Sequence, residues 1–190
     1  MVHSLTLLSL LGALSIASAR ADLRLAPKVC EARLDGAKVK FLVFSDESGK
    51  DIIYGPPTGW EYSGSTSRFT LHPPGKAQAE GTISRISLSQ PGVFDDETMK
   101  KLAAEALASV PAGSTNVTLV SQEKNPLLIG RKETFLVIVS YTLYGDNYQR
   151  SMMFLNRGNE QVRFQFVSRA VDFKDLQAAF QGSHFTWRNL

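Results

Sequence analysis

The segment from Tyr148 to Leu155 is apolar on both sides of an expected strand, and this feature constrains the fold more than any other. Alternate side chains of a strand point to opposite faces of a sheet, so Met152 and Phe154 share one face. Met153 and Leu155 share the other face. A sheet with one solvated face does not accommodate such a strand at low cost. The strand therefore requires a cover of other elements on both sides.

Two further strands flank this segment in the sequence, and the short loops between them predict an antiparallel meander. The strands cover residues 133–144 and 161–168, and the loops cover residues 145–147 and 156–160. Another strand, over residues 117–122, precedes them. The strand over 133–144 is also apolar on both faces. The last strand directs Val162, Phe164 and Phe166 inward and Gln161, Arg163 and Gln165 outward. This alternation predicts a place nearer the edge of the sheet.

Two amphipathic helices supply the expected cover. Asp95 is expected to cap the first helix, in which Glu97 and Lys101 form an ion pair four residues apart. Capping explains the acidic cluster at residues 95–97 better than a metal site does, because three adjacent carboxylates cannot all point inward. Asp172 is expected to cap the second helix, and Gly182 to close it in a left-handed conformation. Helices between two-sided strands predict an α+β fold, a three-layer α/β/α sandwich with a central, mainly antiparallel sheet.

The first nineteen residues have the pattern of a secretory signal peptide. An apolar run from Leu5 to Ile16 ends at Ala17-Ser18-Ala19, which predicts cleavage after Ala19, with Ala21 as a second cleavage position. The run is shorter than the roughly 20 residues that cross a bilayer, so a retained membrane anchor is the weaker interpretation. The mature chain is expected to be secreted or periplasmic, without a stable membrane span.

Length and composition predict one globular domain after the signal peptide. It is expected to cover residues 59–190, preceded by an extension over residues 20–58 in which residues 39–45 and 51–54 allow a β-hairpin. The chain has 21 basic and 18 acidic residues, and their scatter does not indicate a nucleic-acid partner. Cys30 is the only cysteine, so an intramolecular disulfide is excluded. A buried, inert thiol is favoured over a reactive one or a bridge between two copies.

Several fold-bearing residues occur in a recognisable order. Gly59-Trp60 opens a short strand, Phe69-Thr70-Leu71 precedes Pro73, Leu128-Ile129-Gly130 precedes the long strand, and a helix over 173–180 precedes Phe185. Between Trp60 and Leu190 this order resembles the family of the photosystem II extrinsic protein PsbP, the nuclear-import factor Mog1 and periplasmic DcrB-like proteins. The resemblance implies an antiparallel sheet between helices and a role in binding or assembly. It implies no active-site residue.

The candidate ligand site lies around the Gly-Pro-Pro-Thr-Gly loop at residues 55–59. Tyr54, Trp60 and Tyr62 flank this loop, and His72 precedes two prolines. Exposed aromatic rings on a loop can bind a sugar or a peptide, although packing in the core is favoured for these residues. Only His72 and His184 remain after signal cleavage, and neither has the spacing of a metal site or a catalytic triad. No metal, cofactor or catalytic residue is predicted.

These patterns predict an exported, non-enzymatic binding or assembly module whose partner is a protein or a cell-envelope component. The alternative is a small-ligand-binding protein or an unrecognised hydrolase that uses the region of Trp60 and His72. The two hypotheses differ in what they require of that region, since the second needs an open pocket beside these side chains.

Overall fold

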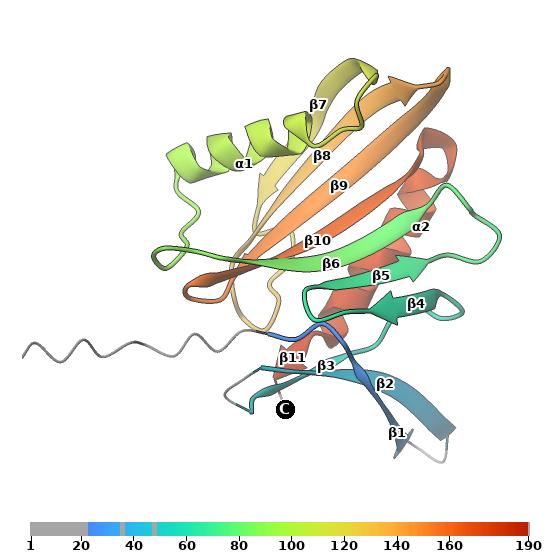
Figure 1. Cartoon of the computed structure of the whole chain (residues 1–190), viewed down its shortest axis with the longest axis vertical. Coiled ribbons are helices and arrows are strands. Elements are labelled where there is room, and N and C mark those ends of the chain that lie inside the picture. The colour runs from blue at the N-terminus through green and yellow to red at the C-terminus, as the bar shows by residue number, and fades with distance from the viewer. Residues whose placement is uncertain (1–22, 35–36, 47–48, 190) are drawn as a thin grey trace, which may run out of the picture.

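The computed structural model describes residues 23–34, 37–46 and 49–189, which form two antiparallel sheets and two α-helices (Figure 1). The seven-stranded sheet has the order β4 (Glu61–Gly64), β5 (Arg68–His72), β6 (Glu80–Ser87), β10 (Glu160–Arg169), β9 (Asp146–Asn156), β8 (Thr134–Leu143) and β7 (Thr115–Lys124). The four-stranded sheet has the order β1 (Lys28–Leu34), β2 (Ala37–Ser45), β3 (Asp51–Tyr54) and β11 (Arg188–Asn189). The helices are α1 (Asp96–Ala108) and α2 (Ala170–Ser183), and a short 3₁₀ helix, η1 (His184–Thr186), follows α2. The predicted signal peptide lies outside the described residues.

Different elements cover the two faces of the seven-stranded sheet. Helix α1 packs on β7 and β8 on one face, whereas α2 packs on β9 and β10 on the other (Figure 1). The core under α1 contains Phe94, Leu102, Ala103, Ala106, Phe135, Val137, Val139, Met152 and Phe154. The core on the other face contains Met153 and Leu155, together with side chains of α2 and of the four-stranded sheet. The α+β fold with a two-sided central sheet is therefore confirmed.

Helix α1 begins as the sequence predicts. The carboxylate of Asp95 accepts a hydrogen bond from the backbone N–H of Thr98 at 2.8 Å, and this bond lowers the pKa of Asp95 below its usual range. Lys101 Nζ lies 2.7 Å from Glu97 Oε1, which confirms the expected ion pair. Leu102, Ala103 and Ala106 are the buried residues of the helix.

Helix α2 differs from the prediction at both ends. It begins at Ala170, so Asp172 lies in its first turn and is not the capping residue. The Asp172 carboxylate instead binds Lys76, at 2.6 Å. Gly182 lies within the helix and does not have a left-handed conformation, because the chain continues directly into η1 and needs no reversal there.

Strand β10 lies between β6 and β9 and not near an edge. Val162, Phe164 and Phe166 are buried on the α2 face as predicted. The polar residues between them lie on the other face, which α1 covers only in part. Gln161 Nε2 donates to Asn156 Oδ1 at 3.0 Å, and the Arg163 guanidinium binds Glu105 of α1. The polar alternation therefore reflects a central strand whose second face is only partly covered.

The four-stranded sheet shares its core with the rest of the chain. Strands β2 and β3 pair antiparallel, as the predicted hairpin requires. Leu42 and Phe44 of β2 lie in the same cluster as Phe69 and Trp187, and the Phe44 and Trp187 rings are 5.5 Å apart. Side chains on both sides of residue 58 thus contribute to one core.

Ion pairs attach the small sheet to the end of the central sheet. The backbone N–H of Leu23 donates to Glu160 Oε1 at 3.1 Å. Arg157 Nη1 lies 3.0 Å from Glu160 Oε2, and Arg157 Nη2 lies 3.8 Å from the Asp46 carboxylate. Asp46 follows β2, whereas Arg157 lies in the turn between β9 and β10 and Glu160 is the first residue of β10. These contacts fix the start of the described chain and the end of β2 against the central sheet.

Candidate functional site

Two of the four candidate ligand residues are buried in the core. Tyr54 is fully buried, its hydroxyl lies 2.8 Å from Ser183 Oγ, and burial raises the pKa of its phenol. The Trp60 ring is nearly parallel to the Phe180 ring, with centroids 6.3 Å apart. Both side chains therefore stabilise the packing of α2 and the small sheet against the central sheet, which is the alternative that the sequence favours for them.

Tyr62 and His72 are exposed but lie on opposite faces of the central sheet. Tyr62 pairs with Leu71 across β4 and β5, and its ring lies 5.7 Å from that of Phe69. His72 pairs with Glu61, one position along, so its side chain belongs to the other face. The structure does not bring the four candidate residues together around one cavity.

His72 lines a shallow groove around the loop between β5 and β6. The groove has a volume of about 430 Å³ and is lined by Glu61, His72 and the loop that begins at Pro73. A second hollow, of about 310 Å³, lies on the other side of the same loop. Gly75, Lys76 and Ala77 line both cavities, so the loop separates the two.

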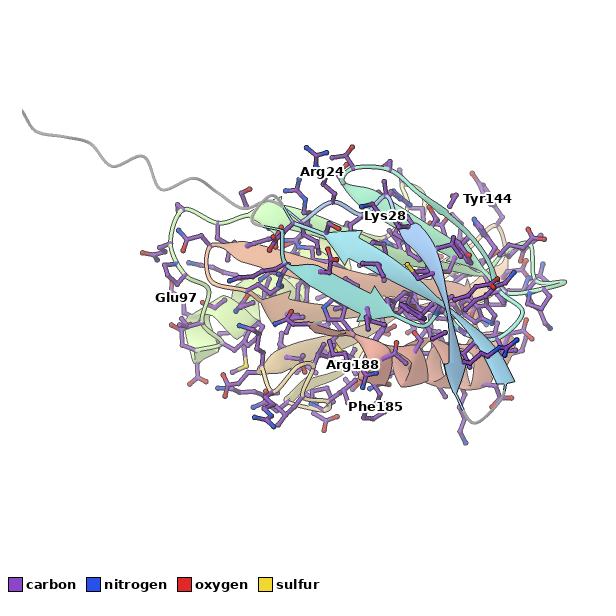
Figure 2. The ribbon with its side chains drawn as sticks, turned by 90° about the horizontal axis from the view of Figure 1, so that it is seen from below. Arg24, Lys28, Glu97, Tyr144, Phe185 and Arg188 are labelled. Atoms are coloured by element: carbon purple, nitrogen blue, oxygen red, sulfur yellow. The ribbon has the colours of Figure 1, made fainter. Side chains whose placement is uncertain are left out.

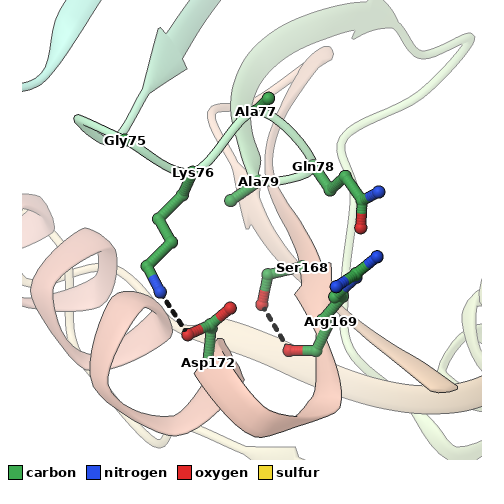
Figure 3. A pocket seen from close by; sticks show the side chains of 8 residues that line it. All are labelled: Gly75, Lys76, Ala77, Gln78, Ala79, Ser168, Arg169 and Asp172. Atoms are coloured by element: carbon green, nitrogen blue, oxygen red, sulfur yellow. Dashed lines mark hydrogen bonds and ion pairs between the residues drawn. The ribbon is translucent and has the colours of Figure 1, made fainter. Parts of the chain in front are cut away.

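The second hollow lies between this loop and the start of α2 (Figure 3). Lys76 faces Asp172 across it, and the Ser168 hydroxyl donates to the Arg169 carbonyl oxygen at 3.1 Å. Arg169 Nη2 in turn lies 2.8 Å from the Asp146 carboxylate. Each cation in the hollow already has an anionic partner, so the site is polar but electrically balanced. Such a lining suits a small ligand with hydroxyl or amide groups.

His184 is a buried titratable group to which the sequence gives no role. Its ring is 1% exposed and lies between the rings of Phe164 and Phe180, with centroids 4.3 and 4.6 Å away. Neither ring nitrogen has a hydrogen-bond partner among the described residues. Burial lowers the pKa of His184 to about 3, so the ring is neutral at physiological pH. No group of three potential metal ligands occurs among the described residues.

The outer face of the four-stranded sheet carries several apolar side chains. The pairing of β2 with β3 places Leu42, Phe44, Ile52 and Tyr54 on the side of the sheet that faces the core. We call the opposite side the basal face; it includes Lys28, Cys30, Ala32, Val39, Phe41, Val43, Ser45, Asp51, Ile53 and Arg188. Val39 is exposed, whereas Cys30, Ala32, Phe41 and Ile53 are half-buried. Figure 2 looks onto this side of the molecule.

Basic side chains border the basal face. Lys28 and Arg188 are exposed on it, and Phe185, which is 73% exposed, precedes Arg188 by three residues (Figure 2). Residues 28–45 contain four basic and two acidic residues, but the strand registers place Arg33 and Lys40 on the side opposite the basal face, whereas Asp51 lies on the basal face. One of the two acidic residues, Glu31, lies 3.8 Å from Lys40 Nζ. The sequence pattern gives no hint of this surface, because β1 is not predicted from it.

Comparison with known proteins shows a recurring fold. No protein-family model and no curated protein sequence matches the chain. The crystal structure of PA94, a protein of unknown function from Pseudomonas aeruginosa, is similar with a TM-score of 0.51 at 16% identity, over 83% of this chain and 94% of PA94. LpqN of Mycobacterium tuberculosis, a protein involved in cell envelope biogenesis, gives a TM-score of 0.48 at 11% identity, over 86% of this chain and 91% of LpqN. The likeness to PA94 extends to the fold alone. Membership of the PsbP, Mog1 and DcrB-like family stays a prediction.

Within the described residues, neither helix is long and apolar enough to traverse a bilayer.

Proposed function

We propose that this chain is an exported, non-enzymatic binding module that attaches to a component of the cell envelope through its basal face. The observation that carries the proposal is the gathering of Val39, Phe41 and Ile53 on one open side of a sheet. Apolar side chains that cluster on a surface mark interaction sites, whereas single exposed ones do not. The signal-peptide pattern of the first nineteen residues supports an extracytoplasmic location.

The fixed position of the small sheet also supports a docking role. The ion pair between Asp46, which follows β2, and Arg157 of the β9–β10 turn attaches this sheet to the central sheet. A surface held in this way loses little conformational entropy when a partner binds, so more of the contact free energy appears as affinity. The basal face is therefore a preorganised surface.

A capture experiment from the extracytoplasmic fraction tests the proposal. A tagged chain with its own leader should be recovered there in processed form and should retain an envelope component. The Val39→Glu variant should lose that component, because a charge would enter the apolar contact. Leu128→Glu is the matched control, since Leu128 is also exposed but lies outside the basal face. Retention by both variants, or recovery only in the cytoplasm with Met1 intact, would contradict the proposal.

The hollow between the β5–β6 loop and α2 favours a second candidate function, the binding of a small polar ligand. Its lining by Lys76, Gln78, Arg169 and Asp172 offers hydrogen-bond donors and acceptors in one place. A ligand at 100 times its dissociation constant would stabilise the fold by about 2.7 kcal/mol, which a thermal-shift screen of sugars and amino acids detects. A hit should disappear in the Lys76→Ala variant. A hit that persists in that variant would exclude this hollow as its site.

A further inference from the structure

We infer that the outer edge of β7 binds the same edge of a second copy of this chain, in antiparallel orientation, so that the seven-stranded sheets of two copies join into one. The inference concerns a surface apart from the basal face and goes beyond the proposed function. Its basis is a long strand edge that lacks the protection of the other sheet edges, together with a side-chain pattern that matches itself about a two-fold axis.

The first step of the argument is that β7 is open along its whole length. It is the last strand of the seven-stranded sheet, and no other described strand pairs with its outer edge (Figure 1). All ten of its residues are exposed, although α1 packs against part of the strand. An unpaired strand edge presents a row of backbone N–H and C=O groups, and another strand is the partner that binds such a row. The chemistry of this edge therefore selects an extended segment.

The second step is that the other sheet edges are protected, whereas β7 is not. Strand β4 has four residues, and a Cβ atom on its last one, Gly64, would lie 2.5 Å from the Leu25 carbonyl oxygen, so the chain covers this end of the edge. Strand β11 has two residues. Strand β1 carries three exposed charged side chains, those of Lys28, Glu31 and Arg33. Short, covered or charged edges prevent contact between sheets. In β7, residues 115–122 include neither a proline nor a charged residue.

The third step is the placement of the apolar side chains of β7. Leu119 pairs with a residue of the core under α1. Thr118 and Ser121 pair with residues of β8 that point to the opposite face, so the residues before them, Val117 and Val120, lie on the α1 side with Leu119. Two irregularities in the pairing bring this about, because each inserts an additional residue into β7. Val117, Leu119 and Val120 are 36%, 41% and 50% exposed, so α1 leaves an apolar stripe open along the edge.

The fourth step identifies the partner strand as a second β7. In an antiparallel pair of identical strands, residues at equal distances on opposite sides of the two-fold axis face each other. The midpoint of β7 lies between Leu119 and Val120, so the apolar stripes of two copies would meet at the axis. The charged end, Glu123 and Lys124, would face the uncharged residues 115–116 of the other copy. An in-register parallel pair would instead place like charges side by side. An unrelated peptide would not require the apolar residues to lie at the middle of the strand.

Sedimentation equilibrium tests the inference on the chain from Arg20 onward, which retains every described contact. One strand edge with three apolar side chains is a small interface, for which we expect a dissociation constant on the order of 10 µM. The chain should be a monomer well below this concentration and a dimer well above it. Val120→Lys should weaken the dimer about 100-fold or more, because two lysines would meet at the axis. Val29→Lys is the matched control, since Val29 is 55% exposed on β1, an edge strand of the other sheet, and should leave the dimer unchanged.

Disulfide formation between copies tests the orientation of the strands. In a Cys30→Ser background, Val120→Cys should give a disulfide-linked dimer, because residue 120 lies next to its own copy at the axis. Thr115→Cys or Lys124→Cys alone should not, because each residue would be about 30 Å from its copy. A mixture of these two chains should form the mixed dimer, since the two positions face each other. Circular dichroism should show every variant folded, and the cysteine variants decide the matter if Val120→Lys does not fold.

Several results would overturn the inference. The first is a chain that stays monomeric at every concentration up to about 1 mM. The second is a dimer that Val29→Lys dissociates and Val120→Lys does not, since the contact would then lie in the four-stranded sheet. The third is a Lys124→Cys chain that bridges alone as readily as Val120→Cys. A monomeric chain that captures an extended peptide, and loses it in Val120→Lys, would assign the edge to a foreign strand. None of these results involves Val39→Glu, so failure of this inference leaves the proposed function standing.

Discussion

Lowering the pH from 7 to 5 should destabilise the folded protein by about 2 kcal/mol through His184 alone. Burial lowers the pKa of this ring from 6.5 to about 3, so in this interval the unfolded chain binds a proton that the folded chain does not. The free energy of unfolding therefore falls as the pH drops below 6.5, and it continues to fall until about pH 3. Above pH 7 the ring is neutral in both states and contributes no pH dependence.

The size of the effect follows from the surroundings of the ring. His184 lies between Phe164 and Phe180, and neither nitrogen has a partner among the described residues that would offset the charge. At pH 5 the unfolded imidazole is about 30 times more often protonated than neutral, which corresponds to about 2 kcal/mol. For a domain of this length the loss lowers the melting temperature by about 4–8 °C.

Urea unfolding at pH 7 and pH 5, followed by the fluorescence of the buried Trp187, measures this difference. Carboxylates add their own pH dependence, so the decisive quantity is the difference between the unmodified chain and a His184→Leu variant. That variant should lose about 2 kcal/mol less between the two pH values. His72→Gln, a change at an exposed histidine, is the control and should behave like the unmodified chain. An equal loss of unfolding free energy between pH 7 and pH 5 in the unmodified chain and in His184→Leu would refute the reasoning.

Three further changes test the packing that positions the basal face. Gly81→Ala would place a Cβ atom 2.9 Å from Phe180 Cε2, so urea unfolding should show a loss of about 1–3 kcal/mol; an unchanged midpoint would mean that the ring moves aside freely. Tyr54→Phe removes a buried hydrogen bond and should cost about 1–2 kcal/mol in the same assay, whereas a stabilised variant would contradict this. Glu160→Gln removes the charge that faces Arg157 and should cost about 3 kcal/mol while exposing the start of the chain to proteolysis. Resistance to protease equal to that of the unmodified chain would argue against an anchoring role for this ion pair.

The layered arrangement could be predicted because its signals are local in the sequence. Met152 and Met153 are adjacent, so their opposite burial requires two covered faces whatever the rest of the chain does. The cap at Asp95 is equally local, because the acceptor and the N–H group that it binds are three residues apart. The turn between β8 and β9 is displaced by one residue from its predicted place. Tyr144 and Gly145 both have positive φ and form the two-residue loop.

The order of the strands could not be predicted, because two kinds of strand, one at an edge and one in the centre of a sheet, show the same alternation of polar and apolar residues. Arg163 and Gln165 alternate with buried residues, which fits an edge strand with one solvated face. It fits a central strand equally well when a helix covers only part of the second face, and Glu105 of α1 supplies the partner of Arg163. Strand order depends on pairings between distant segments, and β6 lies more than seventy residues before β10.

The candidate site was incompletely predicted for a related reason. The Gly-Pro loop at 55–59 predicts exposure of its neighbours, yet Tyr54 and Trp60 point into the core that α2 completes. The hollow beside α2 depends on contact between Lys76 and Asp172, which are 96 residues apart. No local period or motif indicates such a pair. A site built from residues of one segment can be predicted from the sequence, whereas a site assembled from a loop and a distant helix can be found only once the fold is known.

Strand β2 shows why the basal face is more than a by-product of folding. In its C-terminal part Leu42 and Phe44 lie in the core, whereas Val43, which is also buried, lies on the basal side. Before that point Val39 and Phe41 alternate with Lys40, whose side chain is exposed on the core-facing side, beyond the core itself. A hairpin that only extended into water could carry polar residues on both faces without loss of stability. Here Val39 and Phe41 occupy the open side, whereas Glu31 and Lys40 occupy the side toward the protein. The position of Val39 and Phe41 is the reverse of what solubility alone favours, and the contact that the proposed function assigns to the open side accounts for it.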